Sequence, residues 1–185
     1  MHGQIAQVPA YRIKITLNGV KPLVWRRVVL PGAWPLSKVH DAIQLVMGWT
    51  DSHLHEFEVG SVRWGRPDPG WGTGEVRREA TGRLHEVVPA VGDKLLYTYD
   101  FGDDWRHTLL VEELLPPQRV ATCSAGSGAC PPEDCGGLWG YEELVQILAD
   151  PGHPEHQERL EWVGGPYDPK AFDVADASQA LSLLR

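Results

Sequence analysis

The sequence has no apolar run near the roughly 20 residues that cross a membrane, and no signal-peptide pattern at its start. It has only three cysteines among 185 residues, an odd number that does not suit a disulfide framework. These absences exclude a membrane partner and predict a protein of the reducing cytoplasm, with cysteines that are free or metal-bound. Repeats and interdomain linkers are also absent. We therefore expect a loose lead-in over residues 1–10 and a single domain over residues 11–185.

Positive charge is scarce as well: the chain has 17 Lys and Arg residues against 25 Asp and Glu residues, which gives a net charge of −8. Residues 1–85 carry 11 basic and 7 acidic side chains, whereas residues 86–185 carry 6 and 18. An acidic total disfavours non-specific nucleic-acid binding, which depends on neutralising phosphates. The simpler interpretation is that the two halves face each other in one fold. A nucleic-acid binder remains an alternative, and it would use the arginines of the basic half: Arg26, Arg27, Arg77, Arg78 and Arg83.

Alternating apolar and polar residues predict a strand over residues 11–17 and further strands along the chain. The spacing of Leu36, Val39, Ile43 and Val46 predicts a helix that ends at Gly48. The other predicted strands cover residues 23–30, 53–59, 62–64 and the arms of a hairpin over 95–111. Three helices are predicted near the end of the chain, over residues 141–150, 153–163 and 174–184. We therefore expect an α+β fold with a mainly antiparallel sheet, helices packed on it and a helical C-terminal third.

Two residues of the first predicted helix, His40 and Asp41, are expected on its surface. The hairpin LLYTYDFGDDWRHTLLV carries three aspartates, a tryptophan and a histidine around an acidic turn at 101–104. Such aspartates can serve acid/base chemistry or Mg²⁺ binding, but an Asp-rich turn that caps its own backbone is the favoured interpretation. These residues are Asp100, Asp103, Asp104, Trp105 and His107.

His53 and His55 are two residues apart in a predicted strand, so both imidazoles should leave the same face. With His107 and an aspartate of the hairpin turn, they could form a two-histidine, one-carboxylate site. The favoured alternative is that the histidines form hydrogen bonds with neighbouring groups and hold the turn together. Two further carboxylates, Glu133 and Asp134, could join the same region, cap the helix that follows, or pair with Arg26 and Arg27.

The cysteines are spaced C-x6-C-x4-C at Cys123, Cys130 and Cys135, and His107 or the His53/His55 pair could supply the fourth ligand that a tetrahedral zinc site requires. Structural zinc sites usually contain closer C-x2–4-C pairs, so the spacing is only suggestive. The favoured alternative is that the cysteines are small buried hydrophobic residues. Zinc is thus the cofactor that the sequence indicates if one is bound.

With these residues laid out, the chain resembles the plasmid pRiA4b ORF-three-like family, also met as TnpR-like passenger proteins of transposons. The resemblance spans about residues 11–175. It implies a compact α+β domain of a bacterial or archaeal cytoplasm, near mobile elements, and no settled activity. No serine-recombinase pattern supports the TnpR-like label. The motifs are YRIKITLNGVKPLVWRRV, MGWTDSHLHEF, YTYDFGDDWRH, CSAGSGACPPEDCGG with GYEEL, and HPEH…LEWVGG…FD.

These observations favour a non-enzymatic accessory or interaction protein linked to plasmids or transposons, with a His/Asp/Cys cluster as a structural or recognition site. Its partner would be a protein or a small molecule, with nucleic acid less favoured. The alternative is a metal-dependent hydrolase or nuclease, for which the sequence offers no identifiable nucleophile, phosphate loop or known metal motif. The predicted pocket residues are His53, His55, Asp100, Asp103, Asp104, Trp105, His107, Glu133 and Asp134.

Overall fold

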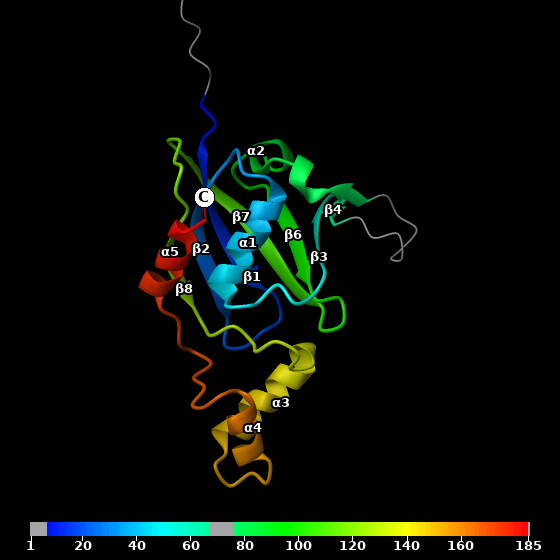
Figure 1. Ribbon diagram of the computed structural model, residues 1–185, viewed down its shortest axis with the longest axis vertical. Helices are drawn as coiled ribbons and strands as arrows, with labels where there is room; N and C mark the ends of the chain where they lie inside the picture. The colour runs from blue at the N-terminus through cyan, green and yellow to red at the C-terminus, as the bar shows by residue number, and fades with distance from the viewer. Residues whose placement is uncertain (1–6, 67–75, 185) are drawn as a thin grey trace, which may run out of the picture.

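One eight-stranded sheet organises the computed structural model, which describes residues 7–66 and 76–184 (Figure 1). The strand order is β5-β4-β3-β6-β7-β1-β2-β8, and every neighbouring pair is antiparallel except β4 and β5. This confirms the predicted α+β fold with a mainly antiparallel sheet. The strands are β1 (Ala10–Leu17), β2 (Val24–Pro31), β3 (His55–Val59), β4 (Val62–Gly65), β5 (Val76–Arg78), β6 (Lys94–Tyr99), β7 (Trp105–Leu115) and β8 (Thr122–Ser127).

The helices lie on one face of the sheet and at one end of the molecule. Helix α1 crosses the sheet, α5 lies beside it next to β8, and α3 and α4 project at the end away from the first described residues (Figure 1). The last third of the chain holds three helices, but it also contributes the edge strand β8. The helices are α1 (Leu36–Met47), α2 (Leu84–Val87), α3 (Gly137–Ala149), α4 (His156–Trp162) and α5 (Val174–Ser182), with a 3₁₀ turn η1 at Glu79–Thr81.

The core forms where the apolar face of the sheet meets α1. Alternate residues of β1, from Tyr11 to Leu17, are buried, as strand geometry requires for a half-buried sheet. Helix α1 buries Leu36, Val39 and Ile43 against them. Each such side chain contributes about 1.5–3 kcal/mol through burial. The spacing of apolar residues in β1 and α1 therefore determines which face of α1 packs against the sheet.

Helix α1 ends at Gly48, as the sequence predicts. Gly48 has a left-handed backbone (φ 87°), and its N–H donates to the carbonyl of Gln44 at 2.8 Å. This conformation, which glycine adopts without steric cost, turns the chain back along α1 toward β3. Residues 49–54 therefore run between the end of α1 and the start of β3, and they carry much of the candidate site.

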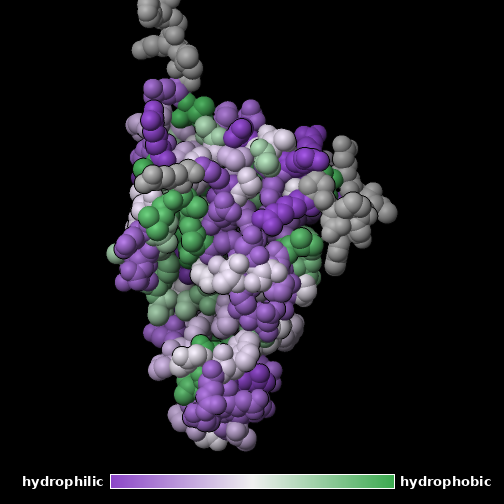
Figure 2. All heavy atoms as spheres, viewed as in Figure 1, coloured by the Kyte–Doolittle hydropathy of each residue, from purple (hydrophilic) through white to green (hydrophobic). Residues whose placement is uncertain are grey.

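Figure 2 shows a largely hydrophilic surface on the face that carries α1, with an apolar group on the side where α5 lies. Among residues 7–66 and 76–184, no helix combines the length and the apolar character that spanning a bilayer requires. Strand β1 begins at Ala10, the last residue of the predicted lead-in, and residues 1–6 of that lead-in lie outside the described residues.

Candidate functional site

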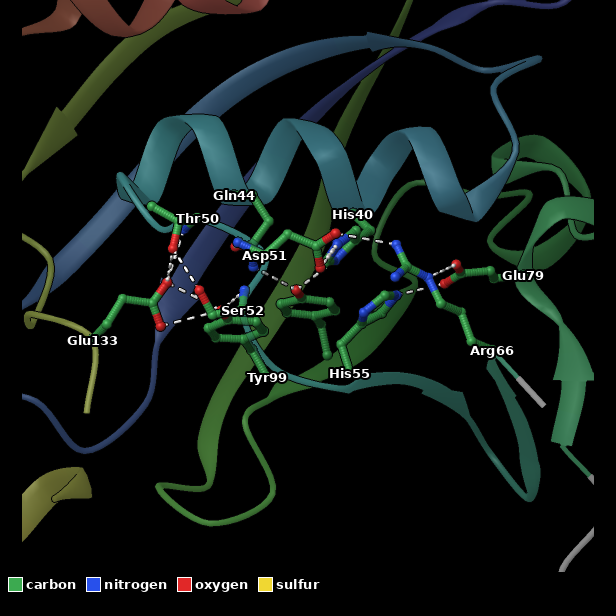
Figure 3. A network of polar contacts seen from close by, with 11 residues as sticks. His40, Gln44, Thr50, Asp51, Ser52, His55, Arg66, Glu79, Tyr99 and Glu133 are labelled. Carbon is green, nitrogen blue, oxygen red and sulfur yellow. Dashed lines mark hydrogen bonds and ion pairs between the residues drawn. The ribbon is translucent and has the colours of Figure 1, made fainter. Parts of the chain in front are cut away.

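His53 and His55, at the end of the segment that follows α1, point into different surroundings. His55 is the first residue of β3, and its side chain lies beneath α1 (Figure 3) with 1% of its surface exposed. His53 precedes the strand, and its ring meets the ring of Tyr99 edge-on at 5.9 Å. The predicted convergence of the two imidazoles is therefore wrong, because regular strand geometry begins only at His55.

Five side chains form what we call the inner cluster: His40, Asp51, His55, Arg66 and Glu79 (Figure 3). The two imidazole rings stack, with centroids 3.5 Å apart and planes within 7° of parallel. Each ring contacts its own carboxylate, His40 Nε2 to Asp51 Oδ1 at 2.9 Å and His55 Nε2 to Glu79 Oε2 at 2.6 Å. Arg66 contacts both carboxylates, at 3.2 Å and 3.6 Å, and so closes the cluster into a ring.

Hydrogen bonds assign the proton of His40. Gln44 Nε2 donates to the Tyr97 hydroxyl at 3.1 Å, and that hydroxyl lies 2.8 Å from His40 Nδ1. Since Tyr97 accepts from Gln44, its own proton is free for Nδ1, and Nε2 carries the proton that Asp51 accepts. Burial, followed by the nearby charge of His55, lowers the pKa of His40 to about 4 despite Asp51. His40 is thus a neutral imidazole with both nitrogens bonded.

The inner cluster balances its own charge. Burial alone would raise the pKa values of Asp51 and Glu79, but interactions with the histidines and Arg66 outweigh it, and both pKa values are lowered. Two carboxylates thus face one guanidinium. A proton on both stacked rings at once would place like charges in contact, and the charge of His55 accordingly lowers the pKa of His40. These mutual contacts stabilise one geometry of the cluster, in which His40, His55 and Glu79 are buried, while Asp51 and Arg66 are exposed.

The stacking also argues against a metal ion shared by His40 and His55. An imidazole binds a metal with a lone pair that lies in the ring plane, at about 2.0–2.1 Å. Here the two planes are nearly parallel and about one ring thickness apart. A shared ion would lie well out of at least one plane. The inner cluster is therefore a hydrogen-bonded frame, in spite of the closeness of its ligand atoms.

Four other side chains form what we call the outer cluster: His53, Asp100, Glu133 and Asp134. His53 Nε2 lies 3.0 Å from Asp134 Oδ1, 3.6 Å from Asp100 Oδ2 and 3.8 Å from Glu133 Oε2. Solvent does not reach this nitrogen, and none of the three oxygens is aligned with it as a hydrogen-bond partner. The ligand atoms of His53, Asp100 and Asp134 all lie within 4.8 Å of one another.

Turn chemistry presents Asp100 to His53. Asp100 has a left-handed backbone (φ 56°), which Asp tolerates better than most residues. Its Oδ1 accepts from the N–H groups of Gly102 and Asp103 at 2.9 and 3.3 Å. That bonding confirms the predicted Asp-rich turn that caps its own backbone, and it leaves Oδ2 directed to His53. Asp134 is also left-handed (φ 57°), in the segment between β8 and α3.

Glu133 connects the outer cluster to residues 50–52, the segment that also contributes Asp51 to the inner cluster. Its Oε1 accepts from the backbone N–H of Thr50 at 2.8 Å and from the Tyr99 hydroxyl at 3.1 Å (Figure 3). The same hydroxyl accepts from the N–H of Ser52 at 3.0 Å. Burial and the charge of Glu133 raise the pKa of Tyr99, so this hydroxyl stays protonated. Residues 50–52 therefore lie between the two clusters and contact both.

The remaining hairpin residues do not join either cluster. Asp103 Oδ2 accepts from the N–H of Gly136 at 3.2 Å, and Asp104 pairs with Arg106 at the surface. Trp105 and His107 lie in the core, and His107 also borders a surface pocket that contains no residue of either cluster. Burial lowers the pKa of His107 to about 4, and its Nε2 has no hydrogen-bond partner.

The cysteines and His107 do not assemble a ligand set in this structure. Cys123 lies in β8 rather than in the predicted loop, while Cys130 and Cys135 lie in the segment that follows it. Burial raises the pKa of all three thiols, that of Cys135 to about 12. In the described part of the chain, no group of three ligand atoms within 4.8 Å of one another includes a cysteine. Zinc at these residues stays a prediction.

The arginines proposed for nucleic-acid binding are dispersed. Arg26 is buried, and its guanidinium stacks 3.7 Å from the Phe172 ring, so its assignment to a binding surface is wrong. Arg27 is bonded to Glu112 at 2.6 Å. The other three, Arg77, Arg78 and Arg83, are exposed near β5 and α2.

Sequence reasoning missed most of the inner cluster. His40 was expected at the surface, yet it is 1% exposed. It lies four residues after Leu36 and three before Ile43, so it shares their buried helix face, and that spacing was a usable signal. Asp41 is exposed, as expected. Arg66 and Glu79 carry no such signal, because they lie at the two ends of a segment without a pattern.

Three comparisons relate the chain to known proteins. A family model described as "Plasmid pRiA4b ORF-3-like protein" matches residues 9–176. The uncharacterized protein y4hQ of Sinorhizobium fredii is 42% identical over 178 residues, which is 94% of this chain and 91% of that protein. The crystal structure of MM3350, a protein of unknown function from Methanosarcina mazei Go1, is 36% identical with a TM-score of 0.83, covering 92% of this chain and 97% of that one. These descriptions name no ligand or reaction.

Proposed function

The chain belongs to the plasmid pRiA4b ORF-3-like family, and on that premise we propose that it is an accessory binding protein of plasmids or transposons whose outer cluster recognises a positively charged group. The observation that supports this proposal is the buried, unpartnered Nε2 of His53, with three carboxylate oxygens 3.0–3.8 Å away. Three carboxylates around one imidazole leave excess negative charge even when the imidazole is protonated. A cationic group would relieve their mutual repulsion.

Binding is favoured over catalysis because the other reactive side chains have partners or are held in unreactive forms. The inner cluster bonds its histidines to its own carboxylates. The three cysteine thiols have raised pKa values and are therefore poor nucleophiles at neutral pH. A general acid or base would need a titratable group that faces a substrate. The outer cluster, which keeps an unpartnered nitrogen, is the better candidate for contact with a partner.

The proposed role is cytoplasmic and accessory. The family description supports a link to plasmids. We infer the accessory role because the outer cluster is better suited to binding a partner than to catalysis. The alternative of a hydrolase or nuclease would draw on the same outer cluster, but it would also need the hairpin aspartates and His107 to face a common substrate. Asp103, Asp104 and His107 instead contact separate partners.

The test is calorimetric titration of the full-length protein, at low salt, with Mn²⁺, spermidine and arginine amide as three different cations. We compare the wild type with Asp134→Asn, which removes one carboxylate of the outer cluster. Asp104→Asn is the matched control, because Asp104 has the same left-handed backbone in the neighbouring turn but pairs with Arg106 outside the cluster. At least one cation should bind the wild type and the control tenfold more tightly than Asp134→Asn. Equal affinities of all three proteins for every cation would refute the proposal.

A further inference from the structure

We propose that the outer cluster is a metal site for a divalent first-row transition ion of the Mn²⁺, Fe²⁺, Co²⁺ or Zn²⁺ class. The ligands are His53 Nε2, Asp100 Oδ2 and Asp134 Oδ1, which lie within 4.8 Å of one another, and Glu133 Oε2, which lies outside that group and would move toward it to become the fourth. This inference rests on the proposed function and names the cation that the site takes. It differs from the cysteine site that the sequence indicates, because it uses no thiol.

The separations between the ligand atoms are close to those of a coordination shell. An ion with bonds of about 2.1 Å holds neighbouring ligand atoms about 3.0 Å apart in an octahedron and about 3.4 Å apart in a tetrahedron. The three oxygens lie 3.0, 3.6 and 3.8 Å from His53 Nε2. The Asp134 oxygen already has the octahedral separation. The other two would approach His53 by about 0.6 and 0.8 Å for an octahedron, or by about 0.2 and 0.4 Å for a tetrahedron, through rotation of the carboxylate side chains.

Hydrogen bonds from the backbone hold the carboxylates of Asp100 and Glu133 in place, as hydrogen bonds around metal sites hold the ligands. Asp100 uses Oδ1 to accept two backbone N–H groups, and Glu133 uses Oε1 to accept the N–H of Thr50. In each case the second oxygen, Oδ2 or Oε2, is the one that faces His53. Hydrogen bonds of this kind fix the direction of ligands around metals. Asp100 thus presents a free oxygen to His53, whereas Glu133 Oε2 also accepts from the Tyr99 hydroxyl at 3.2 Å.

A bound metal ion explains the unpartnered Nε2 of His53 better than an ion pair between His53 and a carboxylate does. A protonated imidazole among three carboxylates would be expected to align its N–H with one of them, at least with Asp134 at 3.0 Å. No such alignment exists, and the nitrogen is shielded from solvent. A buried polar atom without a partner calls for a specific explanation, such as a bound ion. An ion between the four atoms would satisfy the lone pair of His53 and neutralise the carboxylates together.

The donor set selects the kind of ion. Carboxylate oxygens suit Mg²⁺, Ca²⁺ and Mn²⁺, whereas an imidazole nitrogen favours the transition metals. One nitrogen with three oxygens therefore favours Mn²⁺ to Zn²⁺ over Mg²⁺ and Ca²⁺. Asp134, whose side chain is 69% exposed, is the ligand nearest to solvent and marks the route of entry.

The experiment uses the full-length protein, purified without a metal-affinity tag and freed of metal by chelator. Mn²⁺ binding is followed by the loss of the free-ion electron paramagnetic resonance signal, and electron spin-echo measurements on bound Mn²⁺ test for an imidazole nitrogen. We expect one Mn²⁺ per chain with nitrogen coupling. We also expect at least tenfold weaker binding in His53→Gln and Asp134→Asn, and unchanged binding in Asp104→Asn. Circular dichroism establishes that each variant is folded.

The nitrogen coupling needs no variant, so the inference can fail on the wild type alone. It is overturned if Mn²⁺, Co²⁺ and Zn²⁺ do not bind, if bound Mn²⁺ shows no nitrogen coupling, or if Asp134→Asn and Asp104→Asn bind alike. If spermidine or arginine amide still binds with dependence on Asp134 while the metals do not, the recognition of a cation stands and the metal assignment fails. If no cation binds, both fail.

Discussion

The imidazole rings of His40 and His55 lie face to face, 3.5 Å apart, although they come from a helix and a strand on opposite sides of the same buried space. Each ring is held by a separate carboxylate, and Arg66 contacts both carboxylates. The stack therefore joins α1, β3 and η1 through charge as well as through packing. Because His40, His55 and Glu79 are buried, loss of the partner of any of them should destabilise the arrangement.

Replacement of Glu79 should be costly. Glu79→Gln removes the anionic partner of His55 and leaves Arg66 with Asp51 alone, so we expect the free energy of unfolding to fall by about 3 kcal/mol. Urea unfolding measures the loss. Glu86→Gln, the same change at an exposed residue of α2, should cost less than about 0.5 kcal/mol. Similar losses in the two variants would show that the inner cluster does not stabilise the fold through charge.

Acid should destabilise the protein through its buried histidines. The pKa of His107 is about 4 in the native state, below its ordinary 6.5, because burial disfavours the charged ring. The unfolded chain therefore binds more protons between pH 6.5 and 4, and the free energy of unfolding falls as pH drops through that window. A shift of this size corresponds to about 3 kcal/mol. His40, with a pKa also about 4, contributes in the same direction.

His107→Leu should remove about half of this acid sensitivity, because His40 remains. At pH 7 the variant loses the contact of Nδ1 with the Tyr97 carbonyl at 3.3 Å but nothing at Nε2, so its stability should lie within about 1 kcal/mol of that of the wild type. Urea unfolding at pH 7, 6, 5 and 4.5 gives both comparisons. An unchanged fall in stability between pH 6.5 and 4.5 would show that His107 does not titrate there.

Arg26 should be structural. Its Nε donates to the carbonyl of Val46 at 2.7 Å, near the end of α1, and the guanidinium also donates to Ser127 and stacks on Phe172. A lysine ammonium cannot reproduce the planar fork, so Arg26→Lys should cost about 2–3 kcal/mol. Arg27→Lys, at the neighbouring residue that forms a partly exposed ion pair with Glu112, should cost less than about 1 kcal/mol. Equal costs in urea unfolding would contradict the role of Arg26.

A methyl group at Gly140 should disturb the outer cluster from a distance. A Cβ there would overlap the carbonyl oxygen of Cys135, which is backbone and directly follows Asp134. Alanine is the better helix former by about 1 kcal/mol, so propensity alone predicts that Gly140→Ala stabilises α3. We expect the opposite, a loss of about 1–3 kcal/mol and weaker binding of Mn²⁺.

The control for Gly140→Ala is Gly152→Ala, whose Cβ would meet only the end of the Asp150 side chain at 3.3 Å. Thermal unfolding and Mn²⁺ titration of the two variants test both expectations. A Gly140→Ala protein that is more stable than the wild type would mean that the segment at Cys135 moves aside at little cost.

The sheet was largely predictable because its signals are local. The hairpin of β6 and β7 was confirmed, with Tyr99 opposite Trp105 and the aspartate turn between them. Strand β8 was missed, since TCSAGS has small residues and no alternation of large apolar ones. Backbone pairing with β2 holds β8 in the sheet, although its own sequence shows no strand pattern. Strand β5 was missed for a related reason, because three residues are too few to show a period.

The members of the outer cluster were predictable, but most of the inner cluster and the division of the site into two clusters were not. His53, Asp100, Glu133 and Asp134 were all among the predicted pocket residues, because unusual densities of His and Asp can be seen in the sequence. Their assembly depends on how the segment before α3 packs onto residues 49–52, where Trp49 donates to the carbonyl of Pro131 at 3.0 Å. No local pattern encodes a contact between residues so far apart. The division of the histidines between two clusters therefore appears only in the structure.

The strand order has a consequence for the order of folding during synthesis. The hairpin of β6 and β7 lies between β3 and β1, so strands made early are joined only by a hairpin made later. The pairing of β7 with β1 extends to Leu115 opposite Ala10. Before β6 and β7 are made, a nascent chain presents the edge of β2 that later pairs with β8 and two further open strand edges, one on β1 and one on β3, to whatever it meets. The edges of β1 and β3 are both paired only once the chain has passed residue 115.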